Sequence, residues 1–296
     1  ALDLPFELIE GQPASGAGPA VIPAGFLVAE PTHPAARAFV AAGGDSEAPL
    51  FWRSPIPPGR GIGFSGAARV AGAYLALAGA DGQADTSDQV PELAMAAFQI
   101  AAKLEGHPDN AAASAFGGMT VSVAATDAHQ LNALGFDAVG FDTVGVAAPP
   151  GVYESLRVVV FSPGEGTSTD SSRAHLGETT SLSVATSSIG RSSMWVAAMA
   201  SGRLDLLRNA CRDDLHQPSR LVSRPDSARA LESFLDDDEV LAAWLSGSGP
   251  SVAALVVGDD AAQRLGEQLA DPDHQPGSRV RILRVDVRGV RPVIPD

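Results

Sequence analysis

The feature that most constrains this chain is the stretch over residues 55–72, Pro-Ile-Pro-Pro-Gly-Arg-Gly-Ile-Gly-Phe-Ser-Gly-Ala-Ala-Arg-Val-Ala-Gly. Glycine tolerates positive φ and lets backbone N–H groups approach a ligand closely. The small apolar residues that follow predict a packed helix, so the loop should end at a helix N-terminus, where free N–H groups and the helix dipole favour an anion. We predict a phosphate-binding loop in which Ser65 caps the helix or contacts a phosphate or metal ion.

Two other glycine-loop motifs fit this stretch less well. A Walker A loop ends in Gly-Lys-Ser/Thr, but the single lysine of the chain is Lys103. Residues 61–66 match Gly-x-Gly-x-x-Gly, which in dinucleotide-binding proteins directly follows an apolar strand, whereas prolines precede it here. Residues 57–68 instead resemble the Pro-x-x-x-Gly-Leu-Gly-Ser-Ser-Ala loop of the GHMP kinases, the family of galactokinase, homoserine kinase, mevalonate kinase and phosphomevalonate kinase.

Composition limits the class of protein. A chain of 296 residues is long enough for two domains. Its net charge of −15 would repel nucleic acid and anionic membranes, so local arginines and backbone N–H groups must hold any anionic substrate. No membrane span or signal peptide is visible in the sequence. The lone Cys211 excludes an internal disulfide, suits a reducing cytosol, and lies in an apolar pattern that predicts burial.

Hydrophobic periodicity predicts mixed helices and strands. The expected strands cover residues 1–8, 50–53, 119–125, 156–161 and 279–287. The expected helices cover residues 32–42, 67–78, 90–104, 184–200, 203–215 and 260–270. Residues 147–151 are rich in proline and predict a hinge. We therefore expect two domains, residues 1–150 and residues 151–296.

Four further segments, in order along the chain, resemble homoserine kinases. Residues 105–112, Glu-Gly-His-Pro-Asp-Asn-Ala-Ala, are similar to the Glu-Gly-His-Pro-Asp-Asn-Val-Ala segment of that family. Residues 166–174 resemble its Ser-Thr-x-x-Ala-Arg segment, residues 216–220 its His-Glu-Pro-x-Arg segment, and residues 246–251 its Ser-Gly-Ala-Gly-Pro-Ser turn before an apolar strand. The resemblance implies the two-domain α+β GHMP-kinase fold, with the active site between the domains.

The resemblance also implies the site residues. The ATP phosphates would lie against Pro57, Pro58, Gly59, Arg60, Gly61, Ile62, Gly63, Phe64, Ser65, Gly66 and Ala67. Homoserine would contact His107, Asp109, Asn110, Thr169, Arg173 and Arg220, and the two arginines suit its carboxylate because a guanidinium binds carboxylates bidentately. The catalytic residues would be Asn110, Arg173 and His107. Mevalonate-type kinases have an aspartate where this chain has Asn110, which implies that catalysis depends on positioning, with His107 as an alternative proton acceptor.

The expected metal ligands are Ser65 and Gln99. The family has its metal-binding glutamate eleven residues before the asparagine, a position that Gln99 occupies here. A neutral amide binds Mg²⁺ less well than a carboxylate. We expect Glu105, six residues further on, to lie on a different face of the helix and to be a poor substitute. Phe64 also replaces the first serine of the family loop.

Together these motifs predict an enzyme that uses ATP and Mg²⁺ to phosphorylate the hydroxyl of L-homoserine, giving O-phospho-L-homoserine for threonine biosynthesis. The alternatives are another small-molecule GHMP kinase and a nucleotide-binding member with impaired catalysis. We expect a cytoplasmic protein without nucleic-acid or membrane partners. The sequence does not decide whether the protein is a homodimer. The first motif of homoserine kinases is missing before residues 1–8, which predicts a sequence that starts about twenty residues late, or a variant without that motif.

Overall fold

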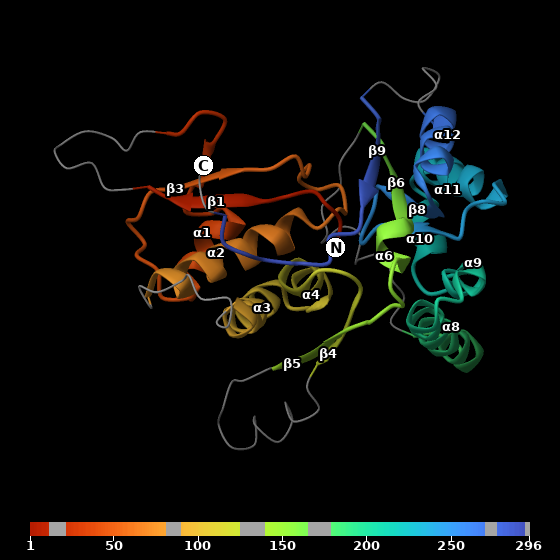
Figure 1. Cartoon of the computed structure of the whole chain (residues 1–296), viewed down its shortest axis with the longest axis horizontal. Helices are drawn as coiled ribbons and strands as arrows, with labels where there is room; N and C mark the ends of the chain where they lie inside the picture. The colour runs from red at the N-terminus through yellow and green to blue at the C-terminus, as the bar shows by residue number, and fades with distance from the viewer. Residues whose placement is uncertain (12–21, 81–89, 125–139, 165–178, 270–276, 294–296) are drawn as a thin grey trace.

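The computed structural model describes residues 1–11, 22–80, 90–124, 140–164, 179–269 and 277–293. Its elements form two groups (Figure 1). One group is a three-stranded sheet with helices α1 to α4 beneath it, on the left of the figure. The other is a four-stranded sheet with helices packed against it, on the right.

The three-stranded sheet is antiparallel, with β3 (Leu50–Arg53) between β1 (Glu7–Glu10) and β2 (Leu27–Val28). The strand predicted over residues 50–53 is confirmed. The strand predicted over residues 1–8 is wrong over residues 1–6, because β1 begins only at Glu7 and Leu2 forms a bridge with Val285 at the other sheet. Pro5 lacks an N–H and separates the two pairings.

Four helices support this sheet, α1 (Pro34–Ala41), α2 (Phe64–Ala80), α3 (Val90–Glu105) and α4 (Asp109–Phe116). The helices predicted over residues 32–42, 67–78 and 90–104 are thereby confirmed. Small residues let these helices approach closely: a Cβ on Gly72 would lie 2.0 Å from the Ala35 carbonyl oxygen. The core between them is built largely from alanines around Phe98, which is fully buried.

A two-stranded antiparallel ribbon follows α4. It pairs β4 (Thr120–Ala124) with β5 (Phe141–Gly145), and Figure 1 shows it below α3 and α4. The sequence predicted β4 but not β5. Phe141, the first residue of β5, is buried in the core that also holds Phe98.

The second sheet is antiparallel, in the order β7-β8-β6-β9. Its strands are β6 (Leu156–Ser162), β7 (Ala242–Leu245), β8 (Val252–Val257) and β9 (Arg279–Arg284). The central strand β6 is buried along its whole length. Strands buried on both faces are typical of sheets covered by helices on each side.

Alternate residues of β6 supply two different cores. Val159 and Phe161 pack with α11 (Pro225–Asp236) and α12 (Asp259–Leu269). Leu156, Val158 and Val160 belong to the core on the other face, with α8 (Leu182–Ser201) and α9 (Leu207–Ala210). Successive side chains of a strand point to opposite faces of the sheet, so β6 contributes to the core beneath each of the two helical layers. The remaining elements are α6 (Val152–Ser155), the 3₁₀ turn η1 (Leu204–Leu206) and α10 (Gln217–Leu221).

The prediction of one continuous helix over residues 203–215 is wrong, because only residues 204–210 are helical. The chain forms η1 and the short helix α9 and then leaves helical geometry after Cys211. The Asp213 carboxylate accepts hydrogen bonds from the backbone N–H groups of Leu215 and Gln217, at 2.7 and 2.9 Å, and so stabilises a turn at this point. Cys211 is buried as predicted, and burial raises the pKa of its thiol. No helix in the described part of the chain is both long and apolar enough to cross a membrane.

Candidate active site

The glycine-rich loop has the predicted conformation. Gly59, Gly61 and Gly63 have φ of 68°, 73° and 80°, in the region that favours glycine. Helix α2 begins directly afterwards, at Phe64. The loop therefore leads into a helix N-terminus, the arrangement that suits a bound phosphate group.

The loop is joined to the glycine-rich turn that follows β7. A Cβ on Gly61 would lie 2.3 Å from the Ser246 carbonyl oxygen, so only glycine fits here. The Ser246 hydroxyl donates to the Gly61 carbonyl at 2.8 Å, and the Ser251 N–H donates to the Arg60 carbonyl at 3.3 Å. Two segments that resemble kinase motifs and lie nearly two hundred residues apart thus form one structure.

A cavity of about 540 Å³ opens beside this loop. It is lined by Pro57, Gly59, Arg60, Gly61, Ile62, Gly63, Phe64, Ser65, Arg69, Glu105, His107, Asp109, Asn110, His216, Arg220, Gly247 and Ser248. Most residues predicted from the sequence are therefore brought together. Thr169 and Arg173 lie outside the described residues.

Three loop residues predicted to bind ATP do not line the cavity, namely Pro58, Gly66 and Ala67. Proline has no N–H to offer a phosphate. The Ala67 N–H donates to the Gly63 carbonyl at 3.0 Å, which closes the first turn of α2. Gly66 serves packing instead, since a Cβ there would lie 2.9 Å from the Asn110 Cβ. This close approach places the start of α4 against the start of α2.

The Arg60 guanidinium does not extend freely into the cavity. It donates hydrogen bonds to the backbone carbonyls of Pro163 and Gly164, just beyond β6. Arg60 therefore fastens the loop to the second sheet, while its backbone lies at the cavity.

A partly buried cluster of Ser65, Arg69 and Glu105 forms one wall. Arg69 Nη1 lies 2.8 Å from Glu105 Oε1 and also donates to the Ser65 hydroxyl. Burial raises the pKa of the Glu105 carboxyl, and the charges of Arg69 and His107 oppose that rise. Glu105 Oε2 is buried without a hydrogen-bond partner among the described residues. A carboxylate oxygen and a hydroxyl oxygen are thus adjacent, which suits a hard divalent cation.

Gln99, the expected metal ligand, has other partners in the structure. Both ends of its amide bind the backbone of Phe141: Nε2 donates to the carbonyl at 2.7 Å, and Oε1 accepts from the N–H at 3.1 Å. Gln99 therefore attaches α3 to β5 and does not line the cavity. Glu105 lies on another face of α3, as expected, but that face is the one that meets Arg69 and Ser65 at the cavity.

The segment over residues 107–110 forms a second wall. His107 Nδ1 is paired with the Asp109 carboxylate, and Asn110 follows in the first turn of α4. The N-cap position is Pro108, and no side chain caps the helix. Capping therefore does not account for Asp109 or Asn110.

The third wall comes from residues 216–220. Arg220 Nη1 donates to the Gly247 carbonyl at 3.0 Å, beside the turn that holds the glycine loop. His216 Nδ1 lies 3.0 Å from Asp213 Oδ2. Burial alone would raise the pKa of Asp213, but His216 and the backbone N–H groups of Gln217 and Leu215 outweigh it and lower that pKa. Asp213 thus fixes the start of α10, which carries Arg220.

Phe64, at the position of a serine in the resembled family, belongs to an aromatic cluster. Its ring meets those of Phe6, His33 and Trp52 edge-on, at centroid distances of 5.5, 5.8 and 5.4 Å. His33 also accepts a hydrogen bond from the Ala35 N–H and so caps α1, and burial lowers its pKa. The large side chain at residue 64 therefore has a packing role.

Five cavity residues were absent from the predicted site: Arg69, Glu105, His216, Gly247 and Ser248. Four of them lie in segments that resemble family motifs, so the motif boundaries could have indicated them. Arg69 has no such signal, apart from its place one helical turn after Ser65.

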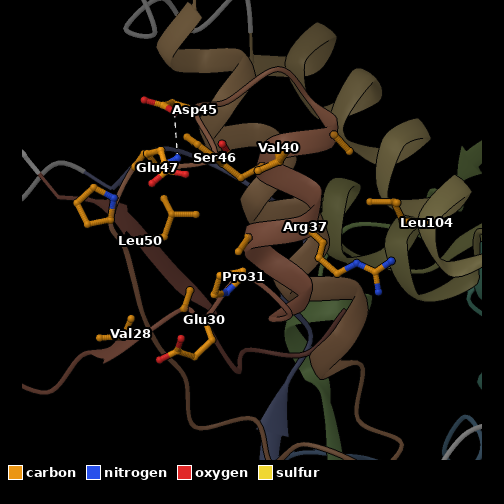
Figure 2. Close-up of a pocket in the computed structure, with 16 residues that line it drawn as sticks. Val28, Glu30, Pro31, Arg37, Val40, Asp45, Ser46, Glu47, Leu50 and Leu104 are labelled. Carbon is orange, nitrogen blue, oxygen red and sulfur yellow. Dashed lines mark hydrogen bonds between the residues drawn. The ribbon is translucent and has the colours of Figure 1, made fainter.

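A larger cavity of about 620 Å³ lies beside α1 (Figure 2). Its floor is apolar, and its rim carries the exposed acids Glu30, Asp45 and Glu47. In Figure 2 the Arg37 side chain extends toward Leu104. The negative rim and the lack of a glycine loop make this cavity unsuited to a triphosphate. We therefore place the candidate active site in the smaller cavity.

Comparisons with known proteins find related sequences and a related fold. A family model described as the GHMP kinases N terminal domain matches residues 31–118, and one described as GHMP kinases C terminal matches residues 195–274. The chain is 36% identical to a homoserine kinase of Thermus thermophilus, over 75% of this chain and 68% of that protein. It is 35% identical to a homoserine kinase of a Mycobacterium species, over 69% of this chain and 59% of that protein. The crystal structure of a homoserine kinase from Cytophaga hutchinsonii superposes with a TM-score of 0.67 and 25% identity, over 86% of this chain and 76% of that one.

Proposed function

The chain belongs to the GHMP kinase family, and on that premise we propose that it transfers the γ-phosphoryl group of ATP to the hydroxyl of L-homoserine, giving O-phospho-L-homoserine. The observation that carries the proposal is the convergence of three segments on one cavity. These are the glycine loop, residues 105–110 and residues 216–220. Relatives that match along the chain are homoserine kinases.

The phosphates of ATP would lie against the glycine loop. Phosphoryl transfer requires mainly the neutralisation of charge and the alignment of donor and acceptor. The start of α2 provides a helix N-terminus at the loop, which favours an anion. Because Arg60 is engaged with backbone carbonyls, its side chain holds the loop in place.

The residues present fit a magnesium ion. Glu105 offers a buried carboxylate with one unpartnered oxygen, and Ser65 offers a hydroxyl beside it. We propose that these two residues, and not Gln99, hold the metal. When bound, Mg²⁺ would neutralise charge on the phosphates. No group of three or more His, Cys, Asp or Glu side chains suited to a metal occurs among the described residues, so phosphate oxygens or water would complete its coordination.

The acceptor would lie between the second and third walls. A guanidinium is suited to the carboxylate of homoserine, and Arg220 lines the cavity at that side. Arg173 and Thr169 remain proposed contacts from sequence resemblance. Asn110 would orient the hydroxyl, and the pairing of His107 with Asp109 fixes the imidazole near it. We propose that the site acts by positioning, with no carboxylate base at residue 110.

The test is ATP turnover with L-homoserine and Mg²⁺, with the product identified by ³¹P NMR. We expect O-phosphohomoserine from the wild-type protein and a loss of at least about a hundredfold in kcat for Glu105→Gln, because a charged metal ligand is removed. The matched control is Gln99→Ala, which should keep the Mg²⁺ requirement. ATP binding without turnover would indicate another alcohol or a binding protein. Turnover in Glu105→Gln with an unchanged Mg²⁺ requirement would contradict the metal assignment.

We further propose the domain division at residue 150. It is supported by the cores: two clusters are built mainly from residues 146–285, and three mainly from residues 8–141. A cytoplasmic location is also a proposal, as is the use of ATP with Mg²⁺. Whether the protein forms a homodimer can be decided by light scattering.

A further inference from the structure

Arg69 lines the cavity, but the phosphoryl-transfer proposal gives it no role. It lies on α2 one turn after Ser65. Its Nη1 donates to the Ser65 hydroxyl and lies 2.8 Å from Glu105 Oε1. Arg69 and Glu105 are largely buried, with side chains 17% and 5% exposed. One guanidinium nitrogen therefore contacts both side chains that would hold the metal.

This contact has an electrostatic cause. A buried carboxylate without a positive partner is costly, so some cation must accompany Glu105 in the folded protein. With no metal bound, Arg69 is that cation. The Arg69 nitrogen donates hydrogen bonds to the Ser65 hydroxyl oxygen and to Glu105 Oε1, which are two of the three oxygens that Ser65 and Glu105 would offer a magnesium ion. Arg69 and Mg²⁺ therefore compete for these oxygens.

The other arginines of the cavity have different partners. Arg60 donates to the carbonyls of Pro163 and Gly164, and Arg220 donates to the carbonyl of Gly247. Both are bound to backbone that belongs to the second half of the chain. Among the described cavity arginines, Arg69 alone is paired with the proposed metal ligands. Binding of a metal by Ser65 and Glu105 would therefore affect the hydrogen bonds of Arg69 and not those of the other two arginines.

We propose that Arg69 is a resident cation that occupies Ser65 and Glu105 until Mg²⁺ arrives together with nucleotide. Free Mg²⁺ binds weakly, because it must displace the guanidinium and leave its charge uncompensated. Mg²⁺ with ATP binds well, because the displaced guanidinium then faces phosphate oxygens in the same cavity. Arg69 is in this sense a positioning residue that couples metal binding to nucleotide binding. The inference rests on the proposed function in one respect, that the cavity is the ATP site.

Binding of Mn²⁺ in place of Mg²⁺ tests the competition directly. Electron paramagnetic resonance reports free Mn²⁺, so the protein can be titrated without nucleotide or homoserine. We expect Arg69→Gln to bind Mn²⁺ about tenfold more tightly than the wild type, equivalent to about 1.4 kcal/mol. Addition of a non-hydrolysable ATP analogue should tighten Mn²⁺ binding strongly in the wild type and much less in Arg69→Gln. Binding of the analogue without metal should weaken in the variant.

The matched control is Arg203→Gln. Arg203 forms an ion pair with Asp205 at 2.7 Å on the surface and does not line the cavity, so the variant makes the same change of net charge elsewhere. Its Mn²⁺ affinity should equal that of the wild type. Arg69→Gln combined with Glu105→Gln should lose the gain in affinity, which assigns the gain to this site.

Arg69→Lys is a second variant for the case in which Arg69→Gln does not fold, because Glu105 keeps a positively charged partner. A single ammonium replaces the fork of a guanidinium, and we expect Mn²⁺ affinity between those of the wild type and Arg69→Gln. If folded Arg69→Gln and Arg69→Lys bind Mn²⁺ no more tightly than the wild type, the resident-cation proposal is overturned. Failure to phosphorylate homoserine would instead count against the proposed function, and these metal titrations would be unaffected.

Discussion

Substitution of Gly61 by alanine tests whether the glycine loop depends on the turn after β7. The added Cβ would lie 2.3 Å from the Ser246 carbonyl oxygen and 2.8 Å from that of Gly249. Both obstacles are backbone atoms, so a side-chain rotation cannot relieve the overlap. The loop and the turn must separate.

The expected cost can be worked out from the structure. Alanine at a φ of 73° costs about 1–2 kcal/mol. Separation would also break the hydrogen bond from Ser246 to Gly61 and the bond from Ser251 to Arg60, each worth about 1 kcal/mol. We therefore expect Gly61→Ala to lower the free energy of unfolding by about 3–4 kcal/mol.

Gly63→Ala is the matched comparison. Its φ is 80°, but a Cβ there would have no atom within 4 Å. It should lose only the backbone term of about 1–2 kcal/mol, as should Gly25→Ala, which lies away from the site at a φ of 78° with equally open surroundings.

Urea denaturation measures the stability of the three variants, and calorimetric titration measures ATP binding. Gly61→Ala should weaken ATP binding at least about tenfold relative to Gly25→Ala, because the loop is displaced. If Gly61→Ala proves no less stable than Gly63→Ala and binds ATP normally, the contact between the loop and the turn does not organise the site, and this reasoning is refuted.

Two further predictions concern residues that support the site. Gln99→Ala should lower the free energy of unfolding by about 1–3 kcal/mol, because the N–H and carbonyl of Phe141 lose their hydrogen-bond partner. The Mg²⁺ dependence of turnover should stay unchanged. If the variant needs more Mg²⁺ than the wild type, Gln99 is a metal ligand after all. Asp213→Asn should cost about 1–2 kcal/mol near pH 6. The pKa of Asp213 is lower in the folded protein than its unfolded value of about 3.9, so ionised Asp213 stabilises the fold above that value and the benefit is lost as pH falls below it. The difference between wild type and Asp213→Asn in urea denaturation should therefore shrink toward pH 3, and a difference that is constant with pH would contradict this role.

Local patterns determined much of the fold. Helices α1, α2 and α3 and strand β6 follow from periodicity, because their apolar residues recur with the period of a helix or strand. Strand β5, helix α11 and the break after Cys211 were not predicted. Their boundaries depend on partners that are distant in sequence or on one side-chain cap, such as Asp213.

The same division applies to the site. The glycine-rich loop and the helix after it could be predicted from local residues, because glycines permit positive φ and the small residues that follow them favour a packed helix. The sequence also indicated the segments at residues 105–110 and 216–220. It favoured Gln99 over Glu105 as the metal ligand. The two residues are six apart on α3, so their side chains point about 120° apart, and spacing cannot tell which direction leads to the cavity.

The packing of the helices determines which of these two residues reaches the cavity. The start of α4 packs against Gly66, and this contact brings the end of α3 beside the first turn of α2. Glu105 then meets Ser65 and Arg69, while Gln99 faces the backbone of β5. Which side chains share a cavity depends on how helices pack together, and that packing is the sum of many contacts that no single motif contains.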